Sequence, residues 1–207
     1  MKLVFNRFIF IVVFLFYSTT IMSSEFRAEY KIELGKINIG SLFWFVEFKD
    51  DKYKITIQLK NKGLFSGLYN FSGDYLAQGT IINDLFVPNK FVQKWKTTKK
   101  KRDIEIYFVN GAVSKLKMLP LEKESPRTKL VGKKGVLDPL SSFVNIVGGS
   151  DLSKTLDGRR FYTMTTENNI INNNTIKKTI LIKDYFNIWA DHNRNDLRFI
   201  EFEQQLD

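Results

Sequence analysis

The 207-residue chain contains no cysteine and a single histidine, His192. Without cysteine it can form no disulfide framework and carry no lipid on a cysteine side chain. One histidine excludes a histidine-rich metal site, and a serine–histidine–aspartate triad would have to use His192. That residue lies in a polar segment, HNRND at 192–196, which is typical of a solvated turn. We therefore expect neither a metal site nor a catalytic site here.

The common catalytic and nucleotide-binding motifs are also missing. No glycine-rich phosphate loop precedes a helical pattern, and no P-loop lysine occurs. Ser141 lies near a sharp turn, but in Pro-Leu-Ser-Ser rather than in a G-x-S-x-G nucleophile elbow. The carboxylates are scattered over turn segments. We predict that the protein is not an enzyme and uses no cofactor.

The one long apolar run, residues 8–17, is shorter than the roughly 17–25 residues that a membrane-spanning helix needs. It follows Lys2 and Arg7 and is followed by small residues, the layout of a secretory signal peptide. The alternative is an uncleaved membrane anchor. We expect a cleaved signal peptide at residues 1–24 and a single β-rich periplasmic domain at 25–207, with no membrane span after cleavage.

Basic residues are in excess, with 32 Lys and Arg against 22 Asp and Glu. This charge would attract anionic lipid or an anionic envelope polymer. It could equally keep a β-rich protein soluble and protect its edge strands. The most basic run, residues 99–102, fits a solvated hairpin tip. Since the protein is expected to be exported, we predict no nucleic-acid partner.

Most of the chain alternates apolar and polar residues with a period of two, which indicates half-buried β-strands. The alternation is clear in residues 26–34, and Asn110-Gly111 is a strong hairpin signal. Residues 61–80 are rich in glycine and fit either a bent strand or an aromatic-lined loop, with strands resuming at 79–86 and a turn at 87–90. About ten strands predict a mostly β fold, an antiparallel meander curled into a barrel or half-barrel.

Residues 136–160 do not alternate in this way. Asp138 is a good helix N-cap, Pro139 suits the first helical position, and apolar residues follow at helical spacing. We predict one short helix at 139–147, packed on the sheet. The turn Asp157-Gly158 and two arginines close the segment. It could be a structural corner, with Arg159 paired to Asp138 or Asp157, or its arginines could contact a ligand.

Aromatic residues are abundant, with 19 phenylalanines in the chain. They could line a cavity for a lipid-like ligand, or they could form an ordinary core that uses phenylalanine in place of leucine. If a cavity exists, the candidate ligand-binding residues are Arg159, Arg160, Trp44, Phe65, Tyr69 and Phe71.

The segments GVLDPLSSF (135–143) and LDGRRFY (156–162) together resemble the bacterial exported family catalogued as domain of unknown function 3108. INIG (37–40), FVPNKF (86–91) and NIWADHNR (187–194) support the resemblance, whereas the family's late proline is replaced at Leu197-Arg198. It implies an exported, mostly β protein with no established activity. The marked positions of the family, to which structural roles are assigned, fall on Gly40, Pro88, Asp138, Pro139, Ser141, Asp157, Gly158 and Arg159.

These observations favour a non-enzymatic periplasmic protein that binds or carries an amphipathic or anionic envelope molecule such as a lipid. The alternative is a scaffold module that interacts with another envelope protein, and a cell-wall hydrolase is a third reading without a supporting motif. The expected curved sheet is also similar to the lidded half-barrels that carry lipoproteins, a likeness of architecture alone.

Overall fold

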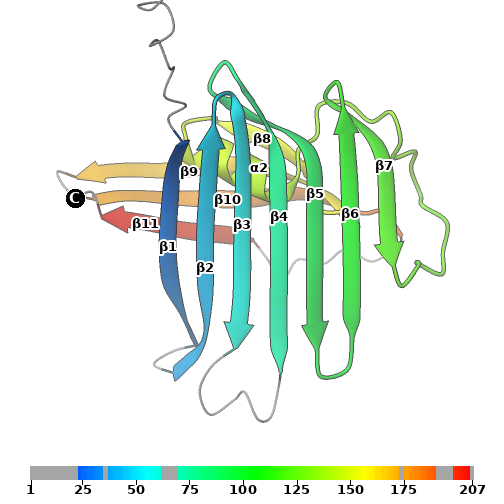
Figure 1. The fold of residues 1–207 in the computed structure, drawn as a ribbon, viewed down its shortest axis with the longest axis horizontal. Coiled ribbons are helices and arrows are strands. Elements are labelled where there is room, and N and C mark those ends of the chain that lie inside the picture. Colours follow the sequence, from blue (N-terminus) through cyan, green and yellow to red (C-terminus); the bar gives the residue numbers. More distant parts are fainter. Residues whose placement is uncertain (1–22, 35–36, 62–69, 173–174, 190–197, 206–207) are drawn as a thin grey trace, which may run out of the picture.

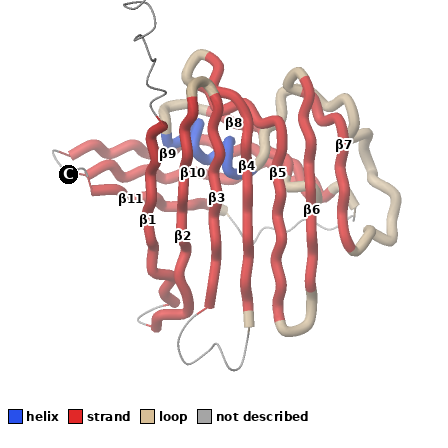
Figure 2. Tube along the Cα trace, viewed as in Figure 1, coloured by secondary structure: helices blue, strands red, loops and turns tan. Residues whose placement is uncertain are grey.

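In a computed structural model, the described residues are 23–34, 37–61, 70–172, 175–189 and 198–205. They form two antiparallel β-sheets and one helix (Figure 1). The predicted signal peptide lies outside these residues apart from its last two positions, and so do Phe65 and Tyr69. The strands contain far more residues than the helix (Figure 2), which confirms a mostly β fold.

The first sheet has seven strands in sequence order, so it is a meander as predicted. Two-residue turns at 83–84 and 110–111 have positive φ at both positions, as tight hairpin turns require. The pairing of the described strands leaves β1 and β7 as the sheet's edges. The strands are β1 (Ser23–Leu34), β2 (Ile37–Lys49), β3 (Lys52–Asn61), β4 (Phe71–Ile82), β5 (Leu85–Thr97), β6 (Lys101–Val109) and β7 (Ala112–Leu119).

The second sheet has four strands in the order β11-β10-β9-β8 and lies behind the first, with its strands running crosswise (Figure 1). Helix α2 (Pro139–Val147) packs between the sheets. In this view the lower ends of β3 to β6 extend beyond the second sheet. Part of the inner face of the first sheet is therefore not covered by the second. The strands are β8 (Leu152–Leu156), β9 (Arg160–Asn172), β10 (Thr175–Asn187) and β11 (Phe199–Gln205).

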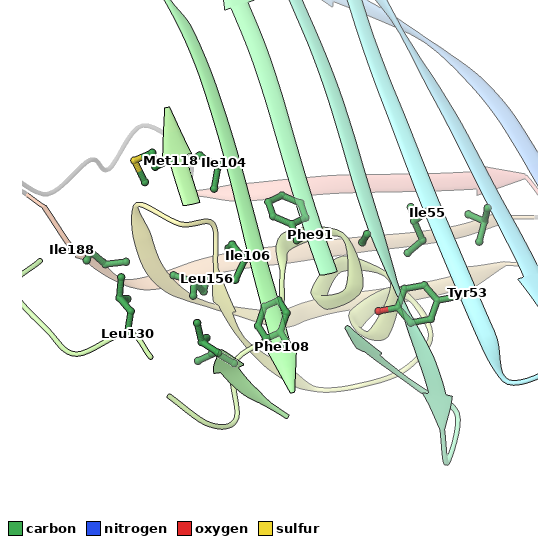
Figure 3. Close-up of a cluster of buried hydrophobic side chains, with 14 residues drawn as sticks. Tyr53, Ile55, Phe91, Ile104, Ile106, Phe108, Met118, Leu130, Leu156 and Ile188 are labelled. Carbon is green, nitrogen blue, oxygen red and sulfur yellow. The ribbon is translucent and has the colours of Figure 1, made fainter. Parts of the chain in front are cut away.

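The main core lies between the two sheets (Figure 3). Alternate residues of each strand point inward, so Ile55, Phe91, Ile104 and Ile106 are almost completely buried. Leu156 of β8 packs against them from the second sheet. Burial of each such side chain contributes about 1.5–3 kcal/mol to folding, which makes this layer the main source of cohesion between the sheets.

Helix α2 begins and ends where the sequence predicted, and Asp138 is its N-cap. The Oδ1 atom of Asp138 accepts hydrogen bonds from the main-chain N–H groups of Leu140 (2.9 Å) and Ser141 (3.1 Å). Ser141 Oγ donates to Asp138 Oδ2 (2.5 Å) and is 2.7 Å from the hydroxyl of Tyr53 on β3. The buried cap therefore also ties the helix to the first sheet.

The predicted turn at 87–90 is wrong, because these residues lie inside β5. Gln78 pairs with Lys90 whereas Gly79 pairs with Pro88, so one residue of β5 is unpaired and forms a bulge. Proline has no N–H to donate to the ladder and is tolerated at such a bulge. The chain reverses instead at residues 83–84.

The structure also assigns residues 71–80, whose conformation the sequence left open, and shows one strand, β8, that was not predicted. Residues 71–80, which fitted either a strand or a loop, belong to β4. Strand β8 was not predicted, because it has five residues and only two of them, Leu152 and Leu156, are large and apolar. Gly40 lies in β2, where an added Cβ would be 2.6 Å from the carbonyl oxygen of Lys60, so this position requires glycine for close strand approach.

Candidate binding pocket

A cavity of about 660 Å³ lies between the uncovered part of the first sheet and the turn that joins β8 to β9. Its apolar wall consists of Phe71 and Tyr75 on β4, Trp95 on β5 and Ile104 on β6. These residues point to the inner face, as Ala77 and Phe91 of the core do on the same strands. The inward-facing positions of these strands thus continue beyond the area that the second sheet covers, and their aromatic side chains are left half-buried there.

The opposite wall is the Asp-Gly-Arg-Arg turn at 157–160, which the carboxylate of Asp157 organises. Its Oδ1 atom accepts hydrogen bonds from the main-chain N–H groups of Arg159 (2.8 Å) and Arg160 (2.7 Å). Its Oδ2 atom accepts a hydrogen bond from Arg160 Nε (2.9 Å). The indole N–H of Trp189 donates to the carbonyl oxygen of Gly158 (3.0 Å). The turn therefore has one defined geometry.

Gly158 brings this turn close to the first sheet. Its φ is +88°, a conformation that favours glycine, and an added Cβ would lie 2.6 Å from Cγ2 of Ile104 on β6. No larger residue fits there without displacing the turn or the strand. Gly158 thus sets the spacing between the two walls of the pocket.

Arg159 does not pair with either predicted carboxylate. Its Nε atom donates to Glu122 Oε1 (3.0 Å), and Arg102 of β6 donates to the same oxygen. Asp138 is fully buried in the helix cap, so it is out of reach, and Asp157 accepts the side chain of Arg160 instead. The long loop after β7, rather than the turn itself, supplies the partner of Arg159.

The pocket carries an excess of positive charge. Among the described residues, Arg102, Arg159 and Arg160 meet two carboxylates, those of Glu122 and Asp157. Lys99 and Lys100 of the β5–β6 turn also line the cavity, and neither forms an ion pair with any part of the chain that the structure describes. The rim is therefore cationic while the floor is aromatic.

Arg160 and Tyr162 are both half-buried and lie close to Asp157. Burial lowers the pKa of Arg160, but the charge and hydrogen bond of Asp157, together with Tyr162 and Tyr185, outweigh this effect, so the pKa is raised and the guanidinium stays charged. Burial, reinforced by the charge of Asp157, raises the pKa of Tyr162 well above its ordinary value. The tyrosine hydroxyl is thus neutral, and the positive charge at this corner is permanent.

Neither a membrane-spanning helix nor a metal cluster is found in the parts of the chain described. None of the helices there has the length and apolar character needed to cross a membrane. In the same residues, no group of three or more His, Cys, Asp or Glu side chains is placed to hold a metal ion.

The family model described as "Protein of unknown function (DUF3108)" matches residues 26–177. The chain belongs to this family. The match confirms the predicted resemblance and runs from within β1 to the start of β10, so it includes the pocket and the Asp-Gly-Arg-Arg turn. No curated protein and no solved structure matches the chain.

In this DUF3108 chain, three of the six predicted ligand-binding residues line one cavity: Phe71, Arg159 and Arg160. Trp44 lies elsewhere on the inner face, where its ring packs against Phe143 of α2 at 5.5 Å between centroids. It contributes to the core near the helix rather than to this pocket.

No site role was predicted for Tyr75, Trp95, Lys99 and Lys100. The alternation of residues along the strands could have placed Tyr75 and Trp95 on the inner face of the sheet. Trp95 has the same strand parity as the buried Phe91, and Tyr75 has the same parity as the buried Ala77. The expected hairpin tip is confirmed for Lys99 and Lys100, whereas Lys101 and Arg102 belong to β6 and Arg102 pairs with Glu122. The proximity of that tip to the Asp157 turn depends on how the two sheets pack.

Proposed function

We propose that the protein is a non-enzymatic periplasmic binding or carrier protein for an amphipathic anion of the cell envelope, such as a lipid. In this proposal the seven-stranded sheet acts as a half-barrel, with α2 and the second sheet as its cover. The ligand occupies the cavity between the lower inner face and the turn at 157–160. The observation that carries the proposal is the pairing of an aromatic floor with a cationic rim in one cavity. The periplasmic location rests on the signal-peptide pattern of the sequence.

The floor of the cavity suits an alkyl chain. Phe71, Tyr75 and Trp95 are half-buried and present their rings to the cavity. Each methylene group that moves from water onto such a surface contributes about 0.8 kcal/mol. The volume of about 660 Å³ is within the range of roughly 300–1,000 Å³ that small-molecule sites occupy. A chain of several carbon atoms would be held without any specific polar contact.

The rim supplies the complementary attraction for a charged head. The side chains of Lys99 and Lys100 come from one wall, and those of Arg159 and Arg160 come from the other. A surface of one charge sign raises the local concentration of counter-ions and speeds their association. An amphipathic cation should therefore be rejected by the same rim that accepts an anion.

The polar groups of the pocket favour binding over catalysis. Among the described residues, the cavity lining contains no histidine, and its two threonine hydroxyls are engaged with the main chain. Thr97 Oγ1 accepts a hydrogen bond from the N–H of Lys100 (3.0 Å), and Thr98 Oγ1 accepts one from the N–H of Asn70 (3.0 Å). Asp157 is fully used by its own turn. No lining residue combines a nucleophile with a hydrogen-bonded base.

The alternative, an envelope interaction module, draws on the edge strand β1 (Ser23–Leu34), whose outer main-chain groups have no strand partner in the described residues. Such an edge can accept a strand from another protein. Its charged side chains, including Arg27, Glu29 and Lys31, are of the kind that protect an edge from this pairing. We therefore prefer the pocket as the functional feature.

The proposal is tested on protein purified from its own host by native mass spectrometry and by extraction of bound lipid. We expect an acidic amphiphile with the wild type, its loss in Trp95→Ala on the pocket floor, and its retention in Phe45→Ala. Phe45 is a matched control, because it is a half-buried aromatic residue on the outer face of the same sheet. A wild-type protein without ligand, or a ligand retained in Trp95→Ala, would contradict the proposal. A stoichiometric co-purifying protein would favour the interaction module.

A further inference from the structure

The two arginines of the pocket are held in the same unusual way. Arg159 and Arg160 each use the Nε atom to bind a carboxylate, that of Glu122 and that of Asp157 respectively. In the described part of the chain, the terminal Nη1 and Nη2 atoms of both side chains have no hydrogen-bond acceptor. Two guanidinium groups are therefore anchored on one side and free to donate on the other.

This anchoring prepares the arginines for a ligand. A free arginine loses rotamer freedom when it binds, which costs about 0.5–1.5 kcal/mol for each immobilised side chain. Here the protein's own carboxylates already restrict Arg159 and Arg160, whose side chains are only partly exposed. The remaining N–H groups form planar donors that match the oxygens of phosphate or carboxylate in pairs.

The number of donors and the charge of the rim distinguish between these two anions. A carboxylate has one charge and two oxygens, so a single guanidinium satisfies it. A phosphate monoester has a charge of about −1.5 to −2 near pH 7 and three acceptor oxygens outside the ester bond. The cavity offers two anchored guanidinium groups, and Lys99 and Lys100, which have no ion-pair partner among the described residues, add further charge.

We propose that the rim formed by Arg159, Arg160, Lys99 and Lys100 selects a phosphoryl head group over a carboxylate. The inference rests on the proposed function, because it names the head of the amphiphile that the aromatic floor holds. The arginine Nη atoms bind the phosphoryl oxygens, and the lysines balance the second negative charge. The same chemistry would recognise free phosphate, so the test has to separate the two sources.

Binding is measured with purified, delipidated protein by isothermal titration calorimetry below the micellar concentration of each probe. The probes are dodecyl phosphate, dodecanoate and dodecyltrimethylammonium, which share the chain length and differ in the head, together with inorganic phosphate. We expect dodecyl phosphate to bind at least about tenfold more tightly than dodecanoate, a difference of about 1.4 kcal/mol. The cation should not bind, and inorganic phosphate should bind far more weakly because it has no chain.

Variants assign the selectivity to the arginine forks. Arg159→Lys keeps the positive charge but loses the planar donors, so the preference for phosphate should fall toward unity. Lys100→Gln removes charge from the exposed hairpin tip but keeps both arginine forks, so it should weaken dodecyl phosphate more than dodecanoate without abolishing the preference for phosphate. The comparison of probes on the wild type needs no variant, so it remains decisive if a variant folds poorly.

The outcomes separate the inference from the proposed function. Equal affinity for dodecyl phosphate and dodecanoate would overturn the phosphoryl selectivity and leave the amphiphile site standing. If neither anionic amphiphile binds, the proposed function itself is wrong. Inorganic phosphate that binds as tightly as dodecyl phosphate would support phosphoryl recognition and overturn the role of the aromatic floor.

Discussion

Replacement of Gly158 by alanine tests the contact that sets the two walls of the pocket. Two physical costs follow from the geometry. The φ of +88° penalises a residue with a Cβ atom, by about 1–2 kcal/mol. The new Cβ would also lie 2.6 Å from Ile104 Cγ2, an overlap that forces a shift of a well-packed core strand and costs about 1–3 kcal/mol more. We expect Gly158→Ala to lower the free energy of unfolding by about 2–5 kcal/mol.

Gly132 provides a control that isolates the backbone cost. Its φ is also +88°, but an added Cβ would meet nothing within 4 Å. Gly132→Ala should therefore cost only the conformational penalty of about 1–2 kcal/mol. The difference between the two variants measures the overlap with Ile104 alone.

The measurement is urea unfolding of both variants and the wild type, followed by tryptophan fluorescence. In an Ile104→Ala background the overlapping methyl group is absent. The difference in free energy of unfolding between Gly158→Ala and Gly132→Ala should therefore be smaller there than in the wild-type background. Equal losses for Gly158→Ala and Gly132→Ala in the wild-type background would refute the close approach of the turn to β6. The spacing of the pocket walls would then need another explanation.

Two further predictions concern groups buried near α2. Lys178 of β10 is buried, and its Nζ donates to the carbonyl oxygens of Ile146 (3.2 Å) and Val147 (2.5 Å) at the end of the helix. Lys178→Met should therefore lower the free energy of unfolding by about 1–3 kcal/mol. The control is Lys183→Met at an exposed position of the same strand, which should change it very little in the same urea assay. Burial raises the pKa of Asp138 to about 6, against the opposing effect of its hydrogen bonds from Ser141 and Leu140. Because the folded-state pKa exceeds the unfolded value, this residue favours folding below about pH 4 and its contribution is lost as the pH rises through 6. The stability of the wild type relative to Asp138→Asn should therefore fall between about pH 4 and pH 6, and parallel pH profiles would contradict the assignment.

The sequence predicted most reliably the features that depend on neighbouring residues. The bounds of α2 follow from Asp138 and Pro139 at its start and from two glycines at its end, all within one short segment. The turn at Asn110-Gly111 is equally local. The segment at 87–90 failed because its proline and asparagine also suit a turn, and only pairing with β4 makes it a bulged strand. Strand β8 is too short to give a periodic signal.

The pocket was only partly predictable, for a related reason. The alternation of residues along a strand shows which face a side chain occupies, and Trp44, Phe71 and Trp95 all face inward. It does not show which part of that face the second sheet covers. Trp44 is covered by α2, whereas Phe71 and Trp95 are left at the edge of the cover. That difference arises from packing between distant segments.

The partner of Arg159 could not be predicted from the sequence either, because it comes from a distant segment. Its carboxylate comes from Glu122, far away in the sequence and shared with Arg102. Glu122 would stay paired without Arg159, so the ion pair alone does not explain why the turn ends in two arginines. The corner could be held by Asp157, Gly158 and Arg160 alone. What Arg159 adds beyond them is a second set of anchored donors on the rim of the cavity, so under the proposed function the structural corner and the binding site are the same turn.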